Sequence, residues 1–136
     1  MKLSSMPELK IYIRPILLAC GTAYFVFAAA VQYNDPDPLH WMLLYLLSAI
    51  LCGLAFFHRT PGPAIYLTAG MAVTEMAITV GGFIDWLRYG SENVLTAQMT
   101  SARPYIELTR EFFGAAISLV VMLLLARFAR KNTSRT

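Results

Sequence analysis

The stretch VQYNDPDPLHW, residues Val31 to Trp41, separates two long apolar runs of the chain. Proline has no backbone N–H and keeps the residue before it out of the helical region, so both aspartates of this stretch should be extended. Asp37 then suits the N-cap of a following helix, with Pro38 at the first helical position. The stretch therefore predicts a tight turn between two helices, and this turn leaves Gln32, Asp35 and His40 without a structural role.

The composition around this turn indicates a membrane protein. The 136 residues are 57% hydrophobic and only 14% charged, whereas a soluble domain carries about 25% charged residues. Four apolar runs approach the length of about 20 residues that crosses a hydrocarbon core. We expect spans at about residues 16–33, 41–57, 64–84 and 105–126. The predicted fold is all-α, a single integral membrane four-helix bundle over residues 1–136.

Basic residues are distributed unevenly between the segments that flank these spans. With a cytoplasmic N-terminus, the inner segments hold Lys2, Lys10, Arg14, Arg59, Arg127, Arg130, Lys131 and Arg135, and the outer segments hold Arg88, Arg103 and Arg110. The positive-inside rule then predicts that both termini are cytoplasmic, in a plasma membrane or a bacterial inner membrane. Because the basic C-terminal tail follows a span, it favours contact with the lipid bilayer over nucleic acid.

The longest connection, Asp85–Arg103, joins the third and fourth spans. Trp86, Leu87 and Tyr89 are residues of the kind that anchor a chain at the depth of the lipid headgroups. We therefore expect a short interfacial segment on the outer membrane surface.

Ionisable side chains fall at the outer end of every predicted span. Glu107 and Glu111 are four residues apart and share one helical face. The candidate residues for a ligand or metal site are Asn34, Asp35, Asp37, His40, Asp85, Glu107 and Glu111. Clustered carboxylates need a neutralising cation. A divalent metal would supply it, either Ca²⁺, Mg²⁺ or Mn²⁺, or Zn²⁺ with His40 as a ligand. Alternatively, Arg110 and Arg103 would close this rim with structural salt bridges.

Glu75 is an acidic residue near the middle of the third span, where insertion of a carboxylate costs roughly 3 kcal/mol. Small and polar residues recur beside it at helical spacing and predict one stripe that faces the bundle interior. The stripe consists of Thr68, Ala72, Glu75, Thr79 and Gly82. Glu75 would serve either as a proton or cation relay or as a protonated acid hydrogen-bonded to a neighbouring hydroxyl.

Two motifs resemble a known family. The sequence QYNDPDP at residues 32–38, followed by Trp41 and Tyr45, is similar to the signature of the transmembrane protein 220 family. The sequence REFFG at residues 110–114 is similar to a second signature in that family's last span. The resemblance runs from the first span to the fourth and implies a small four-helix membrane protein. It adds weight to Asn34, Asp35, Asp37, Arg110 and Glu111, and it implies no reaction.

These observations favour a binding protein with a carboxylate-rich site on its outer face for a divalent cation or a cationic ligand. One alternative is a structural or assembly subunit with a salt-bridged lid. Another is a small oligomeric transporter that uses Glu75, because pairs of small residues such as Ala77 and Gly81 also suit a homo-oligomer or a membrane protein partner. Enzymatic use of the carboxylates is the less favoured alternative, since no catalytic motif accompanies them.

Overall fold

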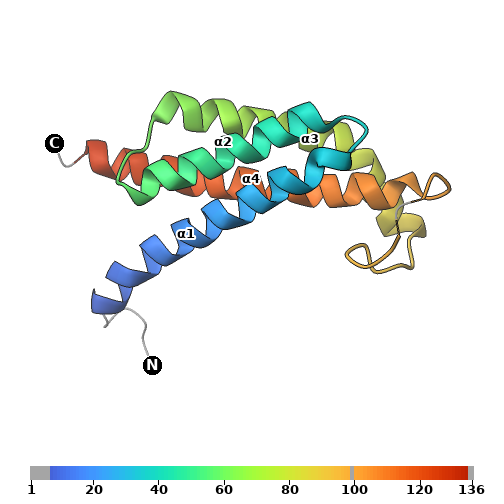
Figure 1. Cartoon of the computed structure of the whole chain (residues 1–136), viewed down its shortest axis with the longest axis horizontal. Coiled ribbons are helices and arrows are strands. Elements are labelled where there is room, and N and C mark those ends of the chain that lie inside the picture. The colour runs from blue at the N-terminus through green and yellow to red at the C-terminus, as the bar shows by residue number, and fades with distance from the viewer. Residues whose placement is uncertain (1–6, 99, 135–136) are drawn as a thin grey trace.

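The computed structural model of the chain describes residues 7–98 and 100–134, and these form four long helices (Figure 1). The helices are α1 (Pro7–Val31), α2 (Pro38–Phe56), α3 (Gly62–Tyr89) and α4 (Pro104–Thr133), and a short 3₁₀ helix, η2 (Gln32–Asn34), follows α1. Each of the four is long and apolar enough to cross a membrane. The prediction of an all-α protein with four spans is confirmed.

The helix boundaries follow the prolines and glycines of the sequence. Proline occupies one of the first two positions of α2, α3 and α4, where its missing N–H costs no intrahelical hydrogen bond. However, α3 continues to Tyr89, five residues beyond the predicted end of its span, because no proline or glycine occurs between Ile84 and Gly90. The connection between α3 and α4 is therefore shorter than expected and begins at Gly90.

The helices associate as two pairs. α1 packs mainly on α2, α3 packs mainly on α4, and α2 is the helix that also contacts both members of the other pair. The beginning of α1 diverges from the bundle, as Figure 1 shows. We call the end with residues 32–37 and 90–103 the acidic end. We call the end with the start of α1, residues 57–61 and the end of α4 the basic end.

Close contact between α2 and α4 joins the two pairs. The hydroxyl group of Tyr45 lies against Gly114 of α4 and occupies the space that a Cβ atom at position 114 would need. One turn further along, the hydroxyl groups of Ser48 and Ser118 lie 3.3 Å apart, and both side chains are buried. Small residues at these positions let the helix backbones approach, as is common in membrane bundles.

The predicted polar stripe of α3 faces the interior. All five of its residues are buried, together with Ile65 and Ala69. Thr68 and Thr79 donate their hydroxyl protons to backbone carbonyls four residues earlier, at 2.9 and 2.8 Å. These bonds satisfy the hydroxyl groups locally, so Glu75 is the member of the stripe that needs a partner from another helix.

We predict that Gly114→Ala destabilises the protein by about 1–3 kcal/mol, because the added methyl group overpacks the contact with Tyr45. Tyr45→Phe removes the hydroxyl group that blocks the site, so the double variant should recover most of the loss. Thermal unfolding of the four proteins in detergent measures this cycle.

Gly81→Ala is the matched control, because a Cβ atom at Gly81 meets nothing within 4 Å. It should leave the melting temperature unchanged or raise it slightly through helix propensity. Equal destabilisation by Gly81→Ala and Gly114→Ala would contradict the proposed packing.

Candidate functional site at the acidic end

The turn after η2 is held by its own aspartate. The backbone N–H of Asp35 donates to the carbonyl of Gln32 at 3.0 Å, and the N–H of Asp37 donates to Oδ1 of Asp35 at 3.0 Å. Asp37 occupies the N-cap position of α2, as predicted, but its side chain makes no capping bond and is exposed. The carboxylate of Asp35 thus fixes the turn and takes its orientation from it.

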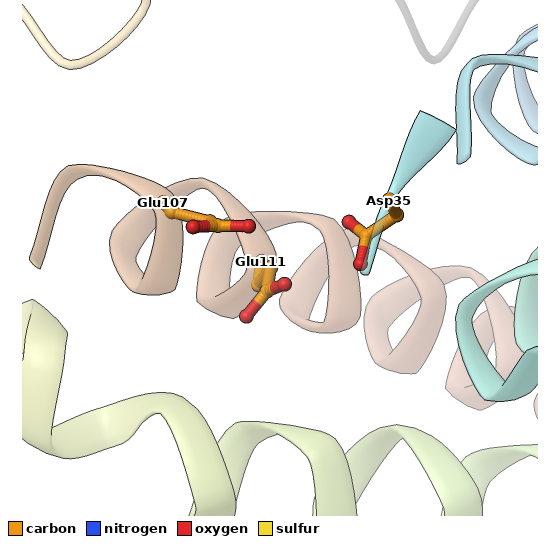
Figure 2. A group of neighbouring side chains, drawn as sticks. All are labelled: Asp35, Glu107 and Glu111. Atoms are coloured by element: carbon orange, nitrogen blue, oxygen red, sulfur yellow. The ribbon is translucent and has the colours of Figure 1, made fainter. Parts of the chain in front are cut away.

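Three carboxylates meet at this turn and form what we call the carboxylate cluster: Asp35, Glu107 and Glu111. One oxygen atom from each lies within 4.8 Å of the others, and all three side chains are partly buried. Figure 2 shows Glu107 and Glu111 one turn apart on α4, with Asp35 approaching from the turn before α2. The predicted shared face of the two glutamates therefore points toward the aspartate of the turn.

The carboxylate cluster lines a cavity of about 340 Å³, which we call the acidic pocket. Its other polar walls come from Gln32, Asn34, Tyr45 and Arg110. Three carboxylates and one guanidinium give the pocket a formal charge of two negative units when all are ionised. Uncompensated charges at the edge of a membrane cost free energy, so a bound proton or cation would stabilise the pocket.

Arg110 holds the α3–α4 connection instead of pairing with a carboxylate. Its Nε donates to the carbonyl of Val94 at 2.5 Å, and its Nη2 donates to the carbonyl of Ala97. Within the described parts of the chain, it forms no ion pair with an acidic side chain. The predicted rim salt bridge through Arg110 is therefore not formed here, because loop carbonyls that lack helical partners take up the guanidinium.

His40 lies against Glu75 and not in the carboxylate cluster. Its Nδ1 is 2.8 Å from Oε1 of Glu75, and the imidazole is about half exposed. The second oxygen, Oε2 of Glu75, is buried and has no hydrogen-bond partner among the described residues. Sequence reasoning missed this pair because it placed His40 at the outer rim and Glu75 in mid-membrane.

The remaining predicted site residues divide between the pocket and the surface. Asn34 lines the acidic pocket. Asp85 is exposed near the end of α3 and does not join the carboxylate cluster. Tyr45 also lines the pocket but was not predicted as a site residue. Its position in the family signature could have indicated this role.

A second polar network closes the α3–α4 connection. Nη1 of Arg103 donates to Oε1 of Glu92 at 2.9 Å, and the hydroxyl group of Tyr105 lies 3.1 Å from both oxygens of the same carboxylate. The hydrogen bond from Arg103 lowers the pKa of Glu92 to about 2, and Glu92 raises the pKa of Arg103 in turn. Arg103 therefore pairs with Glu92 within this connection and does not neutralise the carboxylate cluster.

Comparison with known proteins identifies one family. The family model described as transmembrane family 220, helix, matches residues 24–127. The matched region contains the whole acidic pocket and the His40–Glu75 pair. No curated protein and no solved structure matches the chain significantly.

We predict that the Glu92–Arg103 pair stabilises the protein in a pH-dependent way. A carboxyl whose pKa falls on folding contributes its full stabilisation above its ordinary value of 4.5, and it loses that contribution as the pH falls toward 2. The difference in melting temperature between the unmodified protein and Glu92→Gln should be constant from pH 8 to 5 and vanish near pH 2. A difference that persists unchanged at pH 2 would show that the pair is not responsible.

Proposed function

We propose a cation-binding role for this chain, which belongs to transmembrane family 220 and is a multi-pass membrane protein. The site is the acidic pocket, and the ligand is a divalent cation. The observation that supports it best is the carboxylate cluster, in which one oxygen of each member lies within 4.8 Å of the others and no basic side chain of the described residues forms an ion pair with them. One divalent cation would neutralise the two formal negative charges that remain beside Arg110.

The kind and number of the oxygen atoms favour Ca²⁺. Oxygens within 4.8 Å of one another can share one Ca²⁺, which takes six to eight oxygen ligands at about 2.3–2.6 Å in flexible geometry. Mg²⁺ requires near-ideal octahedral geometry and usually keeps several of its waters, so it is less suited to a pocket of protein oxygens. Gln32 and Asn34 line the same cavity, and their oxygens would add neutral ligands of the kind that Ca²⁺ accepts. With His40 bonded to Glu75, the donor set is oxygen, which disfavours Zn²⁺.

The bias of basic residues supports a topology in which the acidic pocket faces outward. The basic end carries Arg14, Arg59 and the arginines that end α4, and the positive-inside rule assigns such an end to the cytoplasm. The acidic pocket would then open to the extracellular or periplasmic side, where it would meet divalent cations free in solution.

We predict that chelator-stripped protein gains thermal stability when Ca²⁺ is added. Binding to the folded state contributes about 2.7 kcal/mol at a ligand concentration of 100 times Kd, which raises the melting temperature by several degrees. Asp35→Asn and Glu111→Gln should each abolish the rise, because each removes one charged ligand of the carboxylate cluster. Titrations with Ca²⁺, Mg²⁺, Mn²⁺ and Zn²⁺ in detergent give the order of preference.

Asp85→Asn is the matched control, because it removes an aspartate from the same end of the bundle without touching the cluster. It should keep the full rise. If no ion raises the melting temperature, cation binding is wrong, and the contacts of Arg110 and Arg103 would favour a structural lid in an assembly subunit.

A second candidate function is transport by an oligomer, with Glu75 as the coupling acid. The observation that favours it is the His40–Glu75 pair, which joins a buried acid to an imidazole that is about half exposed. Acidic residues within spans mark proton or ion pathways in many membrane proteins. An imidazole can accept a proton on one ring nitrogen and release one from the other, so His40 is placed to pass a proton between solvent and Glu75.

We predict for this second function that Glu75→Gln abolishes proton flux in vesicles that enclose a pH-sensitive dye, while the variant still folds. Gln keeps the size and a hydrogen-bonding oxygen of Glu75 but cannot release a proton. Asp85→Asn should transport like the unmodified protein. Flux that persists in Glu75→Gln would eliminate the relay.

A further inference from the structure

An apolar cavity of about 510 Å³ lies at the basic end between α1, α2 and α4. We call it the apolar groove. Its walls include Leu17 and Leu18 of α1, Cys52 of α2, and Val121 and Leu125 of α4. The groove exists because α1 packs mainly on α2 and diverges from the other helices toward its start (Figure 1).

Arg14 is the charged residue that lines this groove. Its Nε and Nη2 atoms are buried, and neither has a hydrogen-bond partner among the described residues. Its guanidinium carbon lies 5.1 Å from the centre of the Phe128 ring, which accounts for one face of the group but for none of its N–H donors. Buried guanidinium donors without an acceptor are costly, so the arrangement lacks an anion.

The position of Arg14 in the membrane indicates where that anion would come from. Arg14 comes two residues before the long apolar run of α1, which starts at Ile16, so Arg14 lies near the depth of the lipid headgroups. No acidic side chain lines the groove, which runs from Arg14 into apolar surface between helices. A ligand that fits must carry an anionic oxygen group at one end and a hydrocarbon chain at the other.

We propose that the apolar groove binds an anionic glycerophospholipid, with its phosphate on Arg14 and one acyl chain between α1 and α4. Guanidinium donates two parallel hydrogen bonds to phosphate oxygens, and these bonds strengthen where water is excluded. The volume of the groove lies within the range of small-molecule sites. This site is separate from the acidic pocket, so the proposal of lipid binding does not depend on cation binding.

The lipid retained by the full-length protein tests the proposal. Protein in an uncharged detergent is mixed with phosphatidylglycerol or phosphatidylcholine of the same acyl chains, and bound lipid is counted by native mass spectrometry. We expect the unmodified protein to favour phosphatidylglycerol about tenfold, because the choline of phosphatidylcholine brings a second positive charge close to Arg14 and offsets the attraction of its phosphate. Arg14→Gln should reduce this preference to near unity. Arg59→Gln, which removes an exposed arginine from the same end but outside the groove, should keep it.

A groove-filling variant tests the acyl chain separately. Gly21 lines the groove, and a Cβ atom placed there would contact Sγ of Cys52 at the ordinary distance of 3.4 Å, so this position accepts a side chain that occupies groove volume. Gly21→Leu should lower phosphatidylglycerol retention several-fold although all charges remain. Glycerol phosphate, which has the phosphate but no acyl chain, should not compete.

Thermal unfolding in lipid-free detergent separates this role from a structural one. Because Arg14→Gln removes buried donors that have no partner, it should melt no lower than the unmodified protein until phosphatidylglycerol is added. Equal retention of both lipids by the unmodified protein, or full phosphatidylglycerol retention by Arg14→Gln, would overturn the proposal. Competition by glycerol phosphate would do so as well, by reducing the site to a phosphate contact.

Discussion

The close approach of α2 to α4 is the contact on which the rest of the structure depends. α2 is the helix that joins the two helix pairs, and it does so at Gly114, which leaves room for Tyr45, and at the Ser48–Ser118 contact. Because the turn at Asp35 leads directly into α2, the contact between α2 and α4 also positions this turn beside the start of α4. The meeting of Asp35 with Glu111 is thus a consequence of how closely α2 and α4 pack at Tyr45 and Gly114, beside the acidic pocket.

Hydrogen bonding in an apolar solvent explains which polar groups are structural. A bilayer offers no water to an unpaired donor or acceptor, so hydroxyl groups within helices bond to backbone carbonyls of the preceding turn. Thr22, Ser48, Thr68 and Thr79 all follow this rule. Arg14 and Glu75 depart from this rule, because each has buried polar atoms without a hydrogen-bond partner among the described residues, and we assign a lipid phosphate to the first and a proton to the second.

Both proposed binding sites border α1 and α4, at opposite ends of the bundle. The acidic pocket has walls from the last residue of α1 and from Glu107, Arg110 and Glu111 of α4, and the apolar groove has walls from residues near the start of α1 and the end of α4. Since α1 packs mainly on α2, side chains of α4 remain uncovered at both ends. One packing arrangement therefore produces a site with an excess of acid and a site with an unpaired cation.

The sequence by itself determined four spans, the turn between the first two and the interior stripe of α3. Each of these depends on local properties: the length of an apolar run, the geometry of proline, and the helical period. The partners of individual side chains depended on the tertiary structure, because they are fixed by the offset between helices. Because of that offset, His40 lies against Glu75 and Asp85 is exposed. Arg110 bonds to the carbonyls of a loop, and no sequence periodicity predicts the path of that loop.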